Sequence, residues 1–251
     1  MLEQTFTTSL PLDLEVVIPS GDIEIETADG EESRVTVDGD ERLLADVEIR
    51  QDGNRLVVNY RGKGKLGFSF GPFFGGNDLK VRATIPHGAN VKVKTASADI
   101  AVAGRLGSLD VNAVSGDVRV RGEISGDAVL KTVSGDARLE AVGGRVAVQT
   151  VSGDLRLGRA GGSIDTKTVS GDIRCEAVHD GDVRFTSLSG DVEIGIAAGS
   201  LVDVDAGSTS GDLSSEVPLG SEPAATGENG GSTVVVRGRT VSGDVRIFRA
   251  A

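Results

Sequence analysis

The stretch Thr132-Val133-Ser134-Gly135-Asp136-Ala137-Arg138-Leu139 recurs, with small changes, at residues 150–157 and 168–175. Its tripeptide Ser-Gly-Asp also occurs at 20–22, 115–117, 125–127, 189–191, 210–212 and 242–244, and Ser97-Ala98-Asp99 is similar to a degenerate copy. Without the copy at 125, the starts from 97 to 210 are spaced by 18, 19, 18, 18, 19 and 21 residues. Glycine-rich turns fall near the middle of most periods, so the unit has about 18 residues in two halves.

Each half alternates apolar and polar side chains, which is the pattern of a strand with one buried face. After Ser-Gly-Asp the order is apolar, charged, apolar, as in Leu155-Arg156-Leu157. Before the motif, Val146, Val148 and Thr150 represent the inward positions, while Gln149 faces water. No stretch of 10–12 residues shows a helical period, so we expect almost no helix.

An 18-residue unit with two half-buried strands covers its apolar faces by coiling. The sequence therefore predicts an all-β fold, a parallel β-solenoid or β-helix with two strands per turn, in which like residues stack. Six to seven units between 97 and 212 would form a rod about 30 Å long. The alternative is an antiparallel meander of hairpins with nine-residue spacing.

Stacking would align the motif carboxylates at about 4.8 Å, where they would repel one another. These structural-repeat residues are Asp117, Asp136, Asp154, Asp172, Asp191, Asp212 and Asp244. Four basic residues would project from the same strand face and offset the repulsion: Arg119, Arg138, Arg156 and Arg174. The inward Thr132, Thr150 and Thr168 are expected to form a hydroxyl ladder.

The ends of the chain depart from the regular repeat. Residues 1–96 are expected to form an N-terminal β cap or irregular solenoid turns, with strands at 12–18, 23–27, 34–37, 47–50, 55–60, 79–85 and 91–94. Asp52-Gly53-Asn54 predicts a hairpin turn. The regular solenoid would span 97–251, with a flexible loop at 216–233 and strands at 234–237 and 245–248 closing the C-terminal end.

Composition excludes several classes of protein. The 251 residues include 36 Gly, one Cys and only 3% aromatic residues, and the net charge is −12. The charge argues against nucleic-acid binding, and the single cysteine excludes an internal disulfide framework. No signal peptide and no run of about 18 apolar residues is visible, so we expect a cytoplasmic chain with no membrane span.

The motifs of catalysis and metal binding are largely missing from the sequence. His87 and His179 fall in turns without metal-ligand spacing, and Cys175 occupies an inward strand position. Calcium-binding nonapeptide repeats place Asp two residues after Gly, whereas here Asp follows Gly directly. Evenly repeated Asp and Arg residues leave open a carbohydrate-active β-helix enzyme, a lyase or hydrolase, as an alternative. We expect no catalytic residues, no metal and no cofactor.

Residues 61–79 contain four of the seven phenylalanines, preceded by Arg61, Lys63 and Lys65. If the loop is exposed, its aromatic side chains form a candidate contact site. The alternative is that they plug the end of the solenoid. The candidate residues are Phe68, Phe70, Phe73 and Phe74.

The units at 132–139, 150–157 and 168–175, with the irregular β region before them, resemble the bacterial β-strand-repeat family known as "putative adhesin". The resemblance spans roughly residues 10–250 and implies a β-solenoid without known catalytic residues. It also implies a link to cell-envelope stress systems, in which some members carry membrane anchors.

The sequence as a whole predicts a rigid, acidic, non-enzymatic binding or scaffold protein. Its partner would be a protein or a glycan that the sequence does not identify. Self-association through the solenoid ends, giving a self-assembling rod, is the third alternative.

Overall fold

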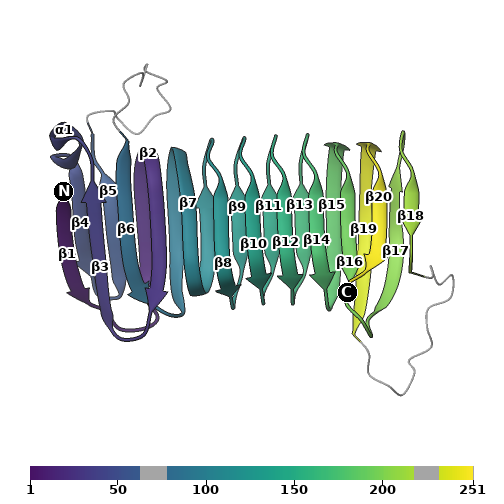
Figure 1. Cartoon of the computed structure of the whole chain (residues 1–251), viewed down its shortest axis with the longest axis horizontal. Coiled ribbons are helices and arrows are strands. Elements are labelled where there is room, and N and C mark those ends of the chain that lie inside the picture. The colour runs from purple at the N-terminus through teal and green to yellow at the C-terminus, as the bar shows by residue number, and fades with distance from the viewer. Residues whose placement is uncertain (63–77, 218–231, 251) are drawn as a thin grey trace.

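The computed structural model describes residues 1–62, 78–217 and 232–250 (Figure 1). In these ranges it contains twenty strands and one short helix, α1 (Glu41–Leu44). The first strands are β1 (Leu2–Thr7), β2 (Asp13–Ala28), β3 (Glu32–Asp38), β4 (Val47–Asp52), β5 (Arg55–Tyr60), β6 (Leu79–Pro86) and β7 (Ala89–Asn112). The regular turns contain β8 (Val118–Ile124), β9 (Ala128–Lys131), β10 (Ala137–Val142), β11 (Val146–Gln149), β12 (Leu155–Ala160), β13 (Ile164–Lys167), β14 (Ile173–Val178), β15 (Gly181–Ser189) and β16 (Val192–Ile196). The last strands are β17 (Leu201–Ser208), β18 (Leu213–Ser215), β19 (Thr233–Ser242) and β20 (Val245–Arg249).

The regular turns form a parallel β-solenoid. Strands β8, β10, β12, β14 and β16, which follow the motif, pair in parallel and form the post-motif sheet. Strands β9, β11, β13 and β15 form the pre-motif sheet in the same way. Like residues stack, as in Arg138 beside Arg156 and Arg156 beside Arg174. The predicted parallel solenoid is confirmed, and the antiparallel meander is wrong.

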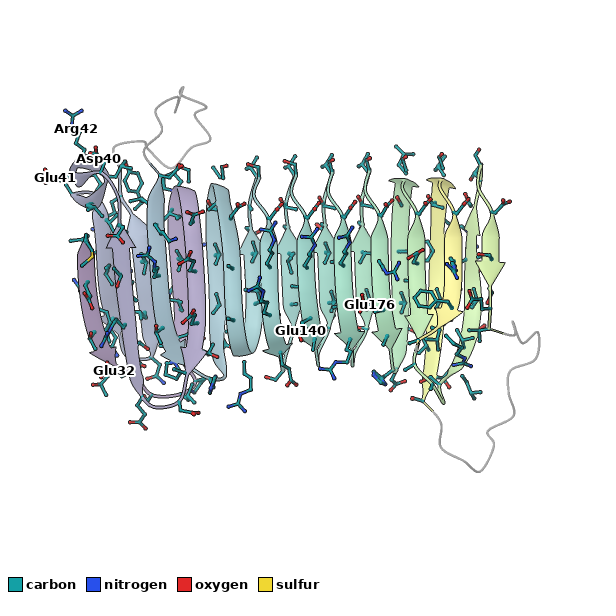
Figure 2. All side chains as sticks on the ribbon, viewed as in Figure 1. Glu32, Asp40, Glu41, Arg42, Glu140 and Glu176 are labelled. Carbon is teal, nitrogen blue, oxygen red and sulfur yellow. The ribbon has the colours of Figure 1, made fainter. Side chains whose placement is uncertain are left out.

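The core is a continuous aliphatic column between the two sheets. Both sheets contribute to it, with Val120 and Leu139 from one and Leu130 and Val148 from the other. The side-chain pattern repeats from turn to turn along the rod (Figure 2). Cys175 is buried in this column, and burial raises the pKa of its thiol to about 12.

The C-terminal strands do not close the solenoid, contrary to the sequence-based expectation. Strand β19 lies between β15 and β17, and β20 lies between β16 and β18. The chain therefore leaves one layer vacant after β16, forms the terminal layer with β17 and β18, and returns to fill the gap (Figure 1).

Two phenylalanine–glycine pairs lie between this inserted layer and the preceding turn. Phe185 lies opposite Gly238, where an added Cβ would approach the ring to 2.5 Å. Phe248 lies opposite Gly195, where an added Cβ would approach its ring to 3.0 Å. In each pair, the phenylalanine ring of one strand occupies space that the glycine of the neighbouring strand leaves free.

The N-terminal region has a similar inserted strand. Strand β2 pairs in parallel with β5 and β6 on one side and with β7 on the other. Antiparallel pairings of β4 with β5, β3 with β6 and β1 with β3 complete this end. Each expected strand lies within an observed strand to within one residue, but 12–18 and 23–27 belong to the single strand β2, and β1 is not among the expected strands. The predicted hairpin turn at Asp52-Gly53-Asn54 joins β4 to β5.

Candidate binding surface

The motif aspartates form a hydrogen-bonded ladder. In each step the backbone N–H of one aspartate donates to the Oδ1 atom of the aspartate on the preceding layer, at 2.8–3.0 Å. The order along the rod is Asp99, Asp117, Asp136, Asp154, Asp172, Asp191, Asp244 and Asp212, because β20 lies inside β18. A backbone donor thus reaches one oxygen of each carboxylate from Asp99 to Asp244.

The second carboxylate oxygen of several aspartates faces a basic side chain. Asp117 Oδ2 lies 2.6 Å from Arg119, while the equivalent distances from Asp136 to Arg138 and from Asp154 to Arg156 are 3.8 and 4.0 Å. Arg174 pairs instead with Glu193 on the next layer. The aspartates therefore join adjacent layers through their backbone hydrogen bonds, whereas Arg119, Arg138 and Arg156 pair with the aspartate of their own turn.

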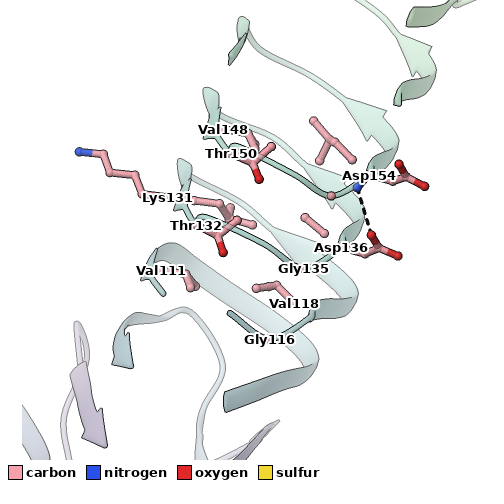
Figure 3. Close-up of a pocket in the computed structure, with 14 residues that line it drawn as sticks. Val111, Gly116, Val118, Lys131, Thr132, Gly135, Asp136, Val148, Thr150 and Asp154 are labelled. Atoms are coloured by element: carbon pink, nitrogen blue, oxygen red, sulfur yellow. Dashed lines mark hydrogen bonds between the residues drawn. The ribbon is translucent and has the colours of Figure 1, made fainter. Parts of the chain in front are cut away.

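The inward threonines do not form a ladder among themselves. Thr132, Thr150 and Thr168 each donate a hydrogen bond to the backbone carbonyl of the motif serine two residues later, at 2.9–3.2 Å. This contact within a turn replaces the expected contact between turns, because a hydroxyl has one proton to donate and the serine carbonyl accepts it. The cavity beside Thr132 and Thr150 has a volume of about 10 Å³, room for one water molecule at most (Figure 3).

A polar groove of about 340 Å³ lies at the N-terminal end, between β2, β5 and β7. Glu15, which is mostly buried, pairs there with Arg55 and Lys94. Burial alone would raise the pKa of Glu15, but the hydrogen bonds from Arg55 and Lys94 outweigh it and hold the pKa below 4.5.

The other charges of the groove are paired as well. Asn90 donates to Asp13 at 2.9 Å, and Lys92 donates to Asp110 at 2.7 Å, a hydrogen bond that raises the pKa of Lys92. The groove therefore consists of mutually satisfied groups that fasten β2 and β5 to β7.

The remaining candidates from the sequence are placed as follows. His87 lies in a turn, as expected, but its side chain is half-buried. Its Nδ1 atom forms a 2.6 Å hydrogen bond with the hydroxyl of Thr27. No group of three or more His, Cys, Asp or Glu side chains suited to a metal ion occurs among the described residues. Phe68, Phe70, Phe73 and Phe74 lie in 63–77, outside the described residues, as does most of the expected loop at 216–233.

One outward-facing row of the repeat is aliphatic. In six of the nine Ser-Gly-Asp copies the residue before the serine is a valine or leucine with 39–52% of its surface exposed. The other three copies have Pro19, the fully buried Ile124 and Thr209 at this position. These residues form what we call the aliphatic row: Val114, Val133, Val151, Val169, Leu188 and Val241. They account for six of the ten large hydrophobic side chains that are exposed in the described part of the chain.

Backbone contacts show that the aliphatic row is continuous. Val133 N–H donates to the carbonyl of Val114, and Val151 N–H to that of Val133. Leu188 and Val241 are neighbours because β15 and β19 pair in register. At about 4.8 Å per layer, the row is roughly 24 Å long. The alternation in the sequence also predicts that these side chains face outward, because the position after the inward Thr132 is the outward Val133.

The two sides of the aliphatic row differ in charge. The nearest outward row of the pre-motif sheet contains Asn112, Lys131, Gln149, Lys167, Thr186 and Arg239, which include no carboxylate. The motif aspartates line the opposite side, and the arginine row that contains Arg138 and Arg156 lies two residues beyond them. Lys131 and Asp136 accordingly point away from each other across this corner of the solenoid (Figure 3).

The sequence model of the Toastrack DUF4097 family matches residues 12–248, which include nearly the whole solenoid. The chain belongs to the Toastrack DUF4097 family. No curated protein matches it. The described part of this Toastrack chain contains no helix long and apolar enough to cross a membrane.

Two solved structures show the same fold. A protein from Bacteroides fragilis described as a "putative adhesin" is 12% identical, with a TM-score of 0.58 over 98% of this chain and 96% of that one. A protein from Parabacteroides distasonis described as a "putative lipid binding protein" is 14% identical, with a TM-score of 0.55 and the same coverage. The resemblance to adhesin-like proteins is thus confirmed at the level of family and fold.

Proposed function

We propose that this Toastrack chain is a non-enzymatic binding and scaffold module that engages its partner through the aliphatic row. The observation that carries the proposal is the exposure of six stacked aliphatic side chains on an otherwise polar corner. Exposed apolar surface is costly in water, and contiguous patches of it commonly mark interaction sites. The fold itself does not need these side chains, because they lie outside the core.

The alternative function, a carbohydrate-active β-helix enzyme, needs carboxylates that are free to exchange protons or attack a sugar. The repeated aspartates are instead engaged by backbone N–H groups from layer to layer. This engagement supports a structural role for them and favours the binding function.

The experiment is affinity capture from native lysate, with soluble and membrane fractions kept separate. The bait is the intact chain, beside a row variant, Val133→Lys with Val151→Lys. A control, Val129→Lys with Ala147→Lys, adds the same charges to outward, partly exposed positions of neighbouring turns on the pre-motif sheet. We expect capture by the intact chain and the control, and at least a tenfold loss for the row variant.

Equal capture by all three baits would contradict a role for the row. Deletion of residues 66–76 in a further bait tests the phenylalanine segment. Polysaccharide cleavage by the intact chain that Asp154→Asn abolishes would contradict the non-enzymatic assignment. Capture from the membrane fraction alone, lost in the row variant, would indicate a lipid surface, the ligand class in the description of the P. distasonis protein.

A further inference from the structure

We propose that the aliphatic row binds the aliphatic row of a second copy of this chain, giving a side-by-side dimer in which the two rods are parallel. This inference rests on the proposed function, because it names the partner of the same surface. It differs from association through the solenoid ends, since the contact runs along the length of the rod.

The geometry of the row favours a second copy as its partner. Six aliphatic side chains follow one another at the spacing of paired strands, about 4.8 Å. A surface with a different repeat would lose register within a few layers, whereas an identical rod has the same rise and the same twist. Symmetric pairing through one shared patch is also the commonest way in which identical chains associate.

The charges beside the row select the direction of the second rod. A two-fold axis along the rod places the side with Lys131 and Lys167 against the partner's aspartate side, and the reverse contact follows by symmetry. A two-fold axis across the rod would instead place lysines against lysines and aspartates against aspartates. The arginines that face some of these aspartates lie two residues farther along the chain, so the aspartates are the charges nearest to the row on that side. Opposite charges attract and like charges repel, so the parallel arrangement is favoured.

The row by itself offers a small contact area. Six half-exposed aliphatic residues per copy bury less than the roughly 1,200 Å² typical of stable interfaces. The flanking charged rows extend the contact, but the net charge of −12 on each copy opposes it. We therefore expect a reversible dimer with a dissociation constant in roughly the micromolar range.

Sedimentation of the full chain over a concentration series tests the association. The intact chain and the control Val129→Lys with Ala147→Lys should form dimers. The row variant, Val133→Lys with Val151→Lys, should raise the dissociation constant at least tenfold. Both mutated side chains are about half exposed, and circular dichroism checks that the variant folds. A chain that remains monomeric at every concentration, or a dimer that the row variant leaves unchanged, would overturn the proposal.

Cysteine cross-linking tests the direction. In a parallel pair each residue of the row lies opposite the same residue of the second copy. Val114→Cys and Val151→Cys should therefore each form an intermolecular disulfide under mild oxidation. In an antiparallel pair Val114→Cys would cross-link only with Val241→Cys, and that result would overturn the parallel arrangement. The native Cys175 is buried and its pKa is raised to about 12, so it should not react.

The two proposals fail in different ways. A monomeric chain whose capture of another partner still depends on the row would overturn the dimer and keep the proposed function. A row variant that changes neither self-association nor capture would overturn both.

Discussion

At the residue scale, the Ser-Gly-Asp motif joins one layer of the solenoid to the next. The aspartate accepts a backbone hydrogen bond from the following layer. The glycine has a positive φ and lies against the backbone of the preceding layer. At Gly135 the φ is +116°, and an added Cβ would lie 2.3 Å from the carbonyl oxygen of Gly116. Both properties exclude a larger residue there.

We therefore expect Gly135→Ala to destabilise the chain by more than backbone strain alone. Gly30 is a matched control, because its φ of +110° is similar but an added Cβ would meet nothing within 4 Å. Gly30→Ala should cost roughly 1–3 kcal/mol from strain, and Gly135→Ala should cost clearly more because the layers must also separate. Urea unfolding measures both, and equal losses would show that the close approach of layers is unimportant.

At the element scale, β2 is the strand that connects the irregular N-terminal region to the regular solenoid. It pairs with β5 and β6 on one side and β7 on the other, and Glu15 contacts Arg55 of β5 and Lys94 of β7. The ion pairs span both neighbours of the strand. They therefore stabilise the junction in addition to the backbone ladders.

The depressed pKa of Glu15 predicts a specific dependence of stability on pH. Its pKa lies below the ordinary 4.5 in the folded chain, so its ionised form stabilises the fold above pH 4.5. This contribution is lost as the pH falls through the lower folded value. Glu15→Gln should reduce the free energy of unfolding by about 1 kcal/mol at pH 7, with the difference from the intact chain shrinking below pH 4.5. A difference that stays constant down to pH 3 in urea titrations would refute this account.

At the scale of the whole molecule, both ends of the solenoid have a strand layer inserted from another part of the chain. At the C-terminal end, β19 and β20 each have a strand on both sides, whereas β17 and β18 each pair on one side only among the described strands. The last strands of the sequence are therefore interior, and the exposed edge is formed by earlier residues.

Hydrogen exchange should follow this spatial order and not the order of the sequence. Amides of β19 and β20 should exchange roughly tenfold more slowly on average than those of β17 and β18, because opening an edge layer disrupts fewer contacts. Mass spectrometry of peptides from the two regions measures the ratio. Faster exchange in β19 and β20 would show that the inserted layer frays independently.

The sequence by itself determined the fold class, the period and the side of each strand that is buried. These properties follow from the spacing of Ser-Gly-Asp and from alternation over a few residues, which local stereochemistry fixes. It also located most strands of the N-terminal region, without β1, and the hairpin at Asp52-Gly53-Asn54.

Only the tertiary structure decided the order of layers, the role of the aspartate ladder and the presence of the aliphatic row. The spacing along the chain cannot show that 233–249 fills a gap between 181–196 and 201–215, because the repeat units are nearly alike in their propensity to stack. The Phe185–Gly238 and Gly195–Phe248 contacts are specific to the observed order, and they form only when distant strands meet. In the same way, six separate aliphatic residues become one surface only when the turns that carry them are stacked.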